Sequence, residues 1–497
     1  MVSLFDTSPY SSSSFAPNAP IPSLPPLLDE QRSVIDAKLS LYTNATSQQL
    51  ALETYFAYCH NQPYSFFHES SFRAQVAYRT IPQYLTYALV VLTLRYTSAS
   101  RDDPNASKTV EAIAKTAWRA ILTQCFETDE GPDYRTVQAT TLLAIHEFIE
   151  CKHRLAWIKI GLAASMAQSL QMMKEPPLNL PTTTREEHRR TLWSIYLLDR
   201  LATCGQNRTP VFHDFSLRLR LPCTEEAFQQ SLPSNAPTMQ EFHGTNFTDL
   251  SSASPFARVV LVTSTLSQIA HVALQQSQED VHWVIWDQGS KHMVIHARLI
   301  SFATFFGASS PIAVGASNTT DSHFSLQVFA RIIYHLCHCV LQHPFVLRQQ
   351  WKTDMFGPLM DFSTNPLLAS WEHAQSLTDA LFSATHAGLP VWASFYGYCS
   401  LVSGTINALH SHSGDEIIRI KSQVALERNV HFLQNHARVY RNASRMLSAL
   451  VDFIKDAESS KHLISTSPTG DRAVTAEEAE RLNSLLDYGL QSTRAVF

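Results

Sequence analysis

The chain has 497 residues and a formal net charge of -5; 45% of its residues are hydrophobic and only 16% are charged. Because average proteins carry about 25% charged residues, this composition indicates a large body with much of its chain buried. The negative charge excludes a global field that attracts nucleic acid. With only 14 glycines, the chain has little material for tight hairpins or phosphate-binding loops.

The first 28 residues form a polar tail with six prolines and a run of four serines, which predicts disorder because too little apolar area is available for burial. This start has neither the basic end nor the apolar core of a secretory signal. Helical periodicity then dominates residues 29–455, which are predicted to form one helical domain. Apolar residues recur at helical spacing in 107–124, with Asn105 or Ser107 as the expected cap.

A second apolar stripe, from Leu155 to Met173, predicts a helix that ends before Pro176 and Pro177. The next helix is expected to begin at Thr183 or Thr184, because each is followed three residues later by a Glu in the manner of a capping box. Two segments rich in Pro, Ser, Thr or Asn predict long loops, at 222–257 and 307–322. Helical patterns return at 258–275, 324–343, 367–384, 391–410 and 418–455.

Residues 456–497 predict a loose segment followed by a short amphipathic helix with four leucines, which we interpret as docking on the body rather than as an activation segment. The stretch 389–409 has no charged residue and is long enough to span a bilayer. It contains Pro390, Gly397 and Gly404 and has no flanking basic cluster, so we predict a buried helix and no membrane span. No alternating pattern persists, and the predicted fold is all-α, a large multi-helix body.

Known catalytic and cofactor motifs are missing from the sequence: there is no G-x-S-x-G, P-loop, G-x-G-x-x-G or H-E-x-x-H. We therefore predict no enzyme activity, no cofactor and no metal. His335, Cys339 and His343 recur every four residues, but eight residues of helix span about 12 Å, so one ion cannot bind all three. The eight cysteines are interpreted as reduced, buried thiols, which places the chain in the cytoplasm or nucleus.

The segment 185–210 carries the sharpest signal. Its middle, from Leu192 to Leu201, is apolar nearly all round, which predicts that protein covers most faces of this helix. Asp199 and Arg200 lie in that run, where a charge must be paired because unpaired burial is costly. The two side chains point about 100° apart, so each is expected to have a different partner, with Arg208 as the candidate for Asp199. The compact basic group at the helix start is predicted to be solvated or internally paired; it comprises Arg185, His188, Arg189 and Arg190.

This segment resembles the fungal-specific transcription factor domain, the middle homology region of zinc-cluster regulators. That family shows an Arg-Arg-x-x-Trp-Trp-x-x-(Tyr/Phe)-x-x-Asp-Arg helix followed by Gly-Arg-Pro. Ser194 stands in place of the second Trp, and the turn is lengthened. The matching residues are Arg189, Arg190, Trp193, Tyr196, Asp199, Arg200, Arg208 and Pro210. Further stretches resemble family motifs in the same order, within a best match over 50–410, at 63–72, 134–148, 156–172, 334–345 and 394–410.

The resemblance implies a nuclear regulator or co-regulator of transcription of pathway genes, such as those of secondary metabolism. It also implies a protein partner, either a second copy or a zinc-cluster regulator. Members of the family read DNA through a six-cysteine zinc cluster, and this sequence contains no such spacing, so no direct nucleic-acid module is visible.

Two alternatives remain open. One is an enzyme or small-molecule-binding protein on the same helices, with uncharged segments such as 389–409 lining an apolar pocket for an effector. The other is an inhibitor that dimerises with a full-length regulator and sequesters it.

Overall fold

The computed structural model describes residues 44–97, 106–205, 208–242, 253–275, 291–306, 322–351, 366–464 and 476–489. Within these ranges the chain is helical, and the only β-pairing consists of two isolated bridges, Lys174 with Arg218 and Arg220 with Thr238. The predicted all-α fold is confirmed. The predicted tail at 1–28 and nearly all of the predicted loop at 307–322 lie outside the described residues.

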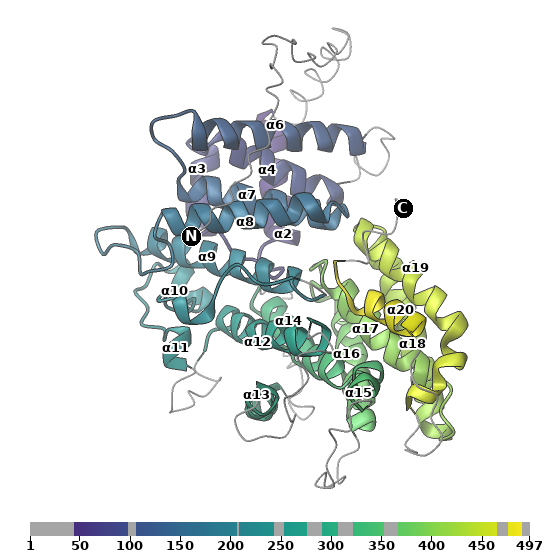
Figure 1. Cartoon of the computed structure of the whole chain (residues 1–497). Helices are drawn as coiled ribbons and strands as arrows, with labels where there is room; N and C mark the ends of the chain where they lie inside the picture. Colours follow the sequence, from purple (N-terminus) through teal and green to yellow (C-terminus); the bar gives the residue numbers. More distant parts are fainter. Residues whose placement is uncertain are drawn as a thin grey trace, which may run out of the picture.

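Three sets of helices follow one another along the chain (Figure 1). The first set comprises α2 (Ala45–Tyr58), α3 (Glu69–Ala77), α4 (Gln83–Thr93), α6 (Ala106–Phe126), α7 (Tyr134–Ile149) and α8 (His153–Ser169). The central set comprises α9 (Thr182–Ala202), α10 (Glu225–Gln229), α11 (Met239–Phe242), α12 (Pro255–Ala270), α13 (Lys291–Phe306), α14 (Ser322–Leu341) and α15 (Pro344–Trp351). The last set comprises α16 (Pro366–His386), α17 (Tyr396–His410), α18 (Glu416–Ala437), α19 (Arg441–Asp456) and α20 (Ala476–Leu486). Buried apolar side chains from all three sets form one contiguous cluster.

Most predicted helices are present, with shifted ends. The pattern at 418–455 is two helices, because α18 ends at Ala437 and α19 begins at Arg441. The long loop expected at 222–257 contains the short helices α10 and α11, and α13 was not predicted. The capping box at Thr183 or Thr184 is wrong: α9 begins at Thr182, Pro181 occupies its N-cap, and no side chain caps it.

The buried face of α8 differs from its most apolar stripe. The predicted stripe includes Leu155 and Ile158, which are 48% and 61% exposed. The buried face is formed largely by small residues, including Ala156, Ala163 and Ala167. Small side chains on this face let α8 approach its neighbours closely, so helix spacing selects the buried face here more strongly than hydrophobicity does.

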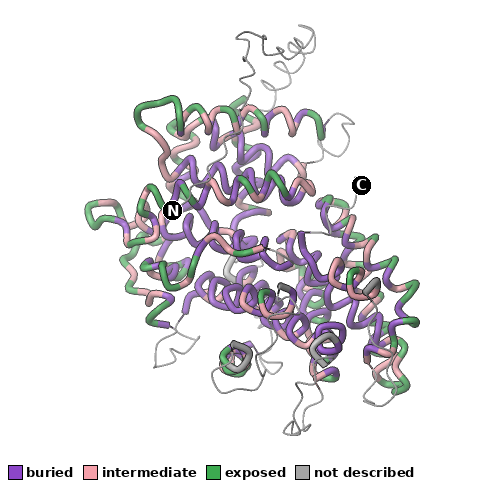
Figure 2. Tube along the Cα trace, in the orientation of Figure 1, coloured by how far each residue is buried: buried purple, intermediate pink, exposed green. Residues whose placement is uncertain are grey.

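Burial is most complete along α7 and α17, whereas α18 and α19 each bury one face and expose the rest (Figure 2). Two helical stretches, Pro255–Leu274 and Phe324–Arg348, are long and apolar enough to cross a membrane, and 72% and 78% of the respective hydrophobic windows are buried within the protein. Core helices have this same character. The uncharged stretch at 389–409 contains α17, whose residues are all buried, as predicted for a helix inside the protein.

Residues 476–489 dock on the body, as predicted. Leu482, Leu485 and Leu486 of α20 are buried. Beyond the helix, the backbone N–H of Tyr488 donates to the carbonyl oxygen of Cys204 at 2.9 Å, directly after α9. The C-terminal segment therefore contacts the chain directly after the helix that carries the family motif.

Candidate functional site

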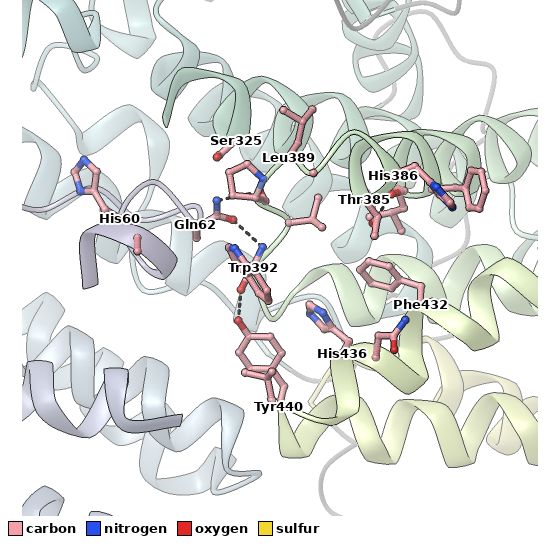
Figure 3. A pocket seen from close by; sticks show the side chains of 18 of the residues that line it. His60, Gln62, Ser325, Thr385, His386, Leu389, Trp392, Phe432, His436 and Tyr440 are labelled. Atoms are coloured by element: carbon pink, nitrogen blue, oxygen red, sulfur yellow. Dashed lines mark hydrogen bonds between the residues drawn. The ribbon is translucent and has the colours of Figure 1, made fainter. Parts of the chain in front are cut away.

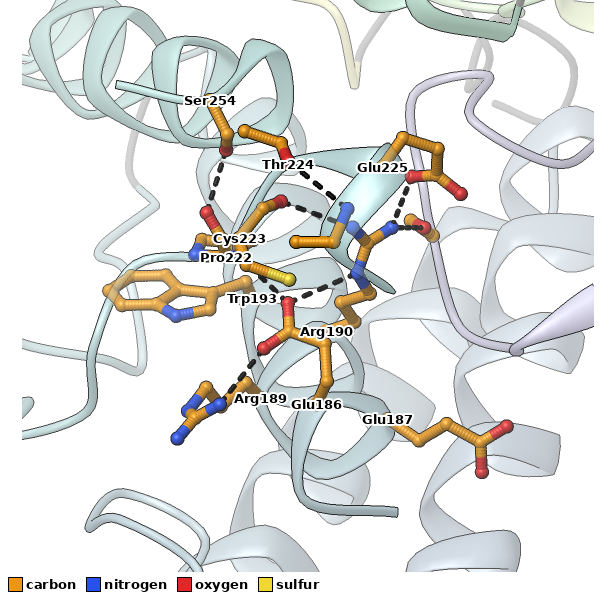
Figure 4. Close-up of polar contacts among 12 residues, drawn as sticks. Glu186, Glu187, Arg189, Arg190, Trp193, Pro222, Cys223, Thr224, Glu225 and Ser254 are labelled. Atoms are coloured by element: carbon orange, nitrogen blue, oxygen red, sulfur yellow. Dashed lines mark hydrogen bonds and ion pairs between the residues drawn. The ribbon is translucent and has the colours of Figure 1, made fainter. Parts of the chain in front are cut away.

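The N-terminal half of α9 is built around Arg190, whose side chain is fully buried. Its guanidinium donates to Glu186 Oε1 at 3.2 Å and to Glu225 Oε2 at 2.6 Å (Figure 4). It also donates to Ser65 Oγ at 2.8 Å and to the carbonyl oxygen of Cys223 at 3.2 Å. Charged groups removed from water are stabilised only when they are paired and hydrogen-bonded. Arg190 thus ties α9 to α10 and to the segment before α3.

Glu186 and Glu187, which were expected to cap the helix, serve tertiary contacts instead. Glu186 also accepts from Arg189 Nη1 at 3.0 Å, and Arg189 bonds to Glu175 at 2.5 Å. Glu187 accepts the backbone N–H of His68 at 2.9 Å. The internally paired interpretation of Arg189 and Arg190 is confirmed.

The second half of α9 anchors the chain that follows it. Trp193 Nε1 donates to the carbonyl oxygen of Arg220 at 2.8 Å. Tyr196 Oη and Arg200 Nη2 both donate to Asp214 Oδ1, at 2.7 and 2.6 Å. Burial raises the pKa of Asp214, but the Arg200 guanidinium and the two hydroxyl donors outweigh this effect and lower it. Asp214 is therefore an ionised anchor for two motif side chains.

Asp199 does not pair with Arg208, and that prediction is wrong. Its carboxylate accepts the backbone N–H groups of Val211, at 3.1 and 3.0 Å, and of Phe212, at 3.2 Å. Arg208 Nη1 instead lies 3.8 Å from Asp487 Oδ1, in the docked C-terminal segment. The expectation that Asp199 and Arg200 have different partners is confirmed. Pro210, with its fixed φ, leads directly into the two N–H groups that Asp199 holds.

Ser194, which stands where the family has a second Trp, makes a contact that only a small hydroxyl side chain can make. Its Oγ accepts the backbone N–H of Ser65 and donates to the carbonyl oxygen of Ser65, both at 3.0 Å. The segment that opens with Pro63 is thereby attached to the middle of α9. A Trp would occupy the space of this backbone.

The histidines and cysteine of α14 face separate partners. His335 Nδ1 lies 2.9 Å from His373 Nδ1, whereas His343 Nε2 lies 3.1 Å from Thr405 Oγ1. Cys339 is fully buried. In the part of the chain that the structure describes, no group of three or more His, Cys, Asp or Glu side chains is placed to hold a metal ion.

Beside this network lies a cleft of about 1310 Å³ between α2 and α3 on one side and α16 and α18 on the other (Figure 3). We call it the α2–α18 cleft. Its apolar walls carry four aromatic side chains that are only partly buried: Phe56, Phe382, Trp392 and Phe432. Glu225, the partner of Arg190, also lines it. The cleft and the motif network therefore share a side chain.

The loop before α17 closes one wall of the cleft and is held from three elements. Gln62 Nε2 donates to the carbonyl oxygen of Pro390 at 3.1 Å, and Gln62 Oε1 accepts the N–H of Trp392 at 3.1 Å. Tyr440 Oη donates to the carbonyl oxygen of Trp392 (Figure 3), and His436 Nε2 lies 3.1 Å from the carbonyl oxygen of Ala393. Residues 388–392 line the cleft, whereas α17 lies in the core. The expected apolar pocket wall is thus confined to the start of the uncharged segment.

Motif residues were recognised from the sequence, but most of their partners were not. Glu186 lies one helical turn from Arg189 and Arg190, and that spacing is a usable signal for an ion pair. Asp214, Glu225 and Ser65 come from other segments, and nothing in their local sequence marks them. Helix geometry fixes neighbours within α9, but only the tertiary fold brings distant carboxylates to it.

Comparison with known protein families shows which family this sequence matches. The model of the fungal specific transcription factor domain matches residues 52–360, which include α9 and its network. The chain belongs to this family.

Three relatives illustrate the match. The chain is 22% identical to the Zn(2)-C6 fungal-type transcription factor FTF1c of Fusarium oxysporum f. sp. lycopersici over 78% of this chain and 43% of that protein. It is 28% identical to an uncharacterized transcriptional regulatory protein of Schizosaccharomyces pombe over 38% of this chain and 20% of that one. It is 32% identical to the ascochitine biosynthesis cluster transcriptional regulator of Didymella fabae over 23% of this chain and 21% of that one. The chain thus spans less than half the length of these relatives.

Proposed function

We propose that this chain is a nuclear regulator or co-regulator that controls transcription of pathway genes, such as a secondary-metabolite cluster. The observation that carries the proposal is the family match over 52–360, because the motif residues of α9 lie within it. Similarity to a protein named as the regulator of a biosynthesis cluster supports the choice of target class. The named relatives are transcription factors and regulators rather than enzymes.

The α9 network suits a regulatory body because it fixes shape. Its charged groups are paired with one another or with backbone groups, so they hold segments far apart in sequence in one arrangement. Binding surfaces built on such a scaffold keep their geometry when a partner or ligand binds. This supports a role in recognition by the body as a whole.

We also propose that the helical body acts together with a protein partner, either a zinc-cluster regulator or a second copy of this chain. The sequence contains no six-cysteine spacing, and burial raises the pKa of all eight cysteine thiols, for example that of Cys59 and of Cys223 to about 12. Zinc is bound by thiolates, so these cysteines are poorly suited to a zinc cluster.

Deletion of the gene followed by transcript measurement tests the regulatory role. We expect transcripts of a set of pathway genes to change and to recover when the chain is expressed again. Unchanged transcripts of all neighbouring and pathway genes would overturn the proposal. Co-precipitation of the tagged chain with zinc-cluster proteins tests the partner, and a rise of the target transcripts on deletion would identify the chain as an inhibitor of that partner.

A further inference from the structure

We propose that the α2–α18 cleft binds a neutral, planar aromatic small molecule. Its volume of about 1310 Å³ leaves room for a small molecule, since usual small-molecule pockets have roughly 300–1,000 Å³. The inference deepens the proposed function, because the ligand would be the effector of the regulator.

The lining supplies aromatic surface from four separate elements. Phe56 comes from α2, Phe382 from α16, Trp392 from the loop before α17, and Phe432 from α18. Phe382 is 37% exposed although it faces a concave site. Covering these partly exposed rings with an apolar ring of a ligand lowers the free energy, because apolar surface is buried and because the rings stack.

The charged side chains that line the cleft, apart from Glu427, have ion-pair partners before any ligand binds. Arg73 pairs with Glu53 at 2.6 Å and with Glu69 at 2.8 Å. Arg428 pairs with Asp379 at 2.6 Å, and Glu225 pairs with Arg190 at 2.6 Å.

Two of these guanidinium groups also cover ring faces on the rim: that of Arg73 lies 5.0 Å from the ring centre of Phe56, and that of Arg428 lies 4.1 Å from that of Phe382. Of the acidic lining residues, Glu427 has no ion pair in the described ranges, and its side chain is exposed to solvent. A charged ligand would lose its hydration and meet no unpaired charge other than that of Glu427, which solvent screens, so the lining favours a neutral ligand.

The amide side chains that a polypeptide would need are already used. Gln62 is bonded to the carbonyl oxygen of Pro390 and to the N–H of Trp392. Asn435 Nδ2 lies 3.0 Å from His431 Nε2. Asn429 is bonded to Thr378 and Ser403 in the core. An extended peptide leaves its own N–H and C=O groups unsatisfied against such a wall. A compact aromatic molecule has no such requirement, and the cleft therefore favours it.

A ligand in this position would contact groups that hold the body together. His60 Nε2 lies 3.6 Å from Glu225 Oε1, and Glu225 binds Arg190 of the family motif. On the opposite wall, the backbone of Trp392 is bonded to Gln62 and Tyr440. Ligand binding therefore reaches both the α9 network and the joint between the first and last helix sets.

The test is a fluorescence titration of the purified full chain with N-phenyl-1-naphthylamine, a neutral aromatic dye. We expect saturable binding at one site in the micromolar range. The matched anion, 8-anilino-1-naphthalenesulfonate, has the same rings and an added sulfonate, and it is expected to bind at least about tenfold more weakly because the cleft offers no free cation.

Two matched variants localise the site. Val424 lines the cleft and is 44% exposed on α18, while Val451 is 37% exposed on α19 and is not part of the lining. Val424→Trp should weaken the neutral dye by at least about tenfold, whereas Val451→Trp should stay within about twofold. Thr385→Phe fills the cleft from α16, where the Thr hydroxyl bonds only to its own helix, at the carbonyl oxygen of Leu381, and should act like Val424→Trp.

Absence of saturable binding, equal effects of the two Trp variants, or equal affinity for the sulfonated dye would each overturn the assignment. Deletion and transcript measurement judge the regulatory role independently of the dye. Transcripts that respond to deletion, together with a cleft that does not bind the dye, would leave the proposed function standing and remove the ligand site.

Discussion

The buried cation Arg190 gives the sharpest test of how the body is held together. In Arg190→Met the aliphatic stem is kept and the guanidinium is removed. Glu186 and Glu225 then lose a shared cation in a site where their side chains are 3% and 7% exposed. Removing one member of a buried ion network costs about 3–5 kcal/mol of the free energy of unfolding, since the remaining charge stays buried and unpaired.

Other partners offset part of that loss, because both carboxylates keep some of their hydrogen bonds. Glu186 still accepts from Arg189 and from the N–H of Cys223, and Glu225 still accepts from Gln229. The guanidinium also lies 4.1 Å from the ring centre of Phe228, a contact that Met replaces only as an apolar one. We therefore expect a loss near the lower end, about 3 kcal/mol.

Urea unfolding followed by circular dichroism measures the loss. The control is Arg481→Met, which removes an Arg from the exposed pair with Asp456, whose side chains are 39% and 54% exposed. Exposed pairs contribute about 0.2–1 kcal/mol. The variant Arg190→Met/Glu186→Gln/Glu225→Gln should be more stable than Arg190→Met alone, because the orphaned charges are gone.

The pH dependence of the free energy of unfolding provides a second test of the ion pair between Arg190 and Glu225. Burial raises the pKa of Glu225, but Arg190 outweighs this and holds the pKa well below its usual value. A carboxyl with a depressed folded pKa stabilises the fold above its unfolded pKa of about 4.5, and this stabilisation is lost as the pH falls through the folded pKa. The difference in the free energy of unfolding between the wild type and Arg190→Met should therefore become smaller below pH about 4.5. A loss no larger than that of Arg481→Met at pH 7 would refute the reasoning.

Three further predictions concern the core. Burial lowers the pKa of His343 to about 3, so below pH about 6.5 the unfolded chain gains a proton that the native chain does not. In urea titrations, His343→Gln should reduce the free energy of unfolding that is lost between pH 7 and pH 5 by about 2 kcal/mol. Equal losses in the wild type and in His343→Gln would contradict this. Gly404→Ala places a Cβ 2.8 Å from Leu450 Cδ2 and should lower the free energy of unfolding by about 1–3 kcal/mol. Gly161→Ala meets nothing within 4 Å and should be neutral or stabilising when both variants are compared by calorimetry. Equal effects of the two substitutions would refute the close approach of Gly404 to Leu450. Tyr488→Ala empties a buried site and should cost about 3–5 kcal/mol in thermal unfolding, and an unchanged midpoint would show that the C-terminal segment does not stabilise the body.

The helices could be predicted wherever an apolar stripe of helical period runs uninterrupted. α6 has buried Ile113, Ala117 and Ile121 at the spacing that its sequence shows. α8 shows where this reasoning fails, because its larger apolar residues Leu155 and Ile158 are exposed and its alanines are buried. Period alone gives the helix, whereas the buried face depends on how closely the neighbouring helix lies.

For the charged residues of the motif, the sequence likewise predicts one part of the arrangement, and the tertiary fold decides the other part. That Asp199 and Arg200 need separate partners follows from their angular separation on one helix. That Asp199 binds backbone N–H groups rather than Arg208 depends on the path of the chain after α9. The cleft was beyond sequence reasoning, because its aromatic walls come from residues as far apart as Phe56 and Phe432.

The most direct test of the account is a transcript profile of a deletion strain, compared with strains that express the wild-type chain or Arg190→Met in its place. The account predicts that transcripts of a pathway gene set change on deletion, recover with the wild-type chain, and recover incompletely with Arg190→Met at a temperature where that variant unfolds. Transcripts that are unchanged in all three strains, together with turnover of a pathway intermediate by the purified chain, would contradict a regulatory role.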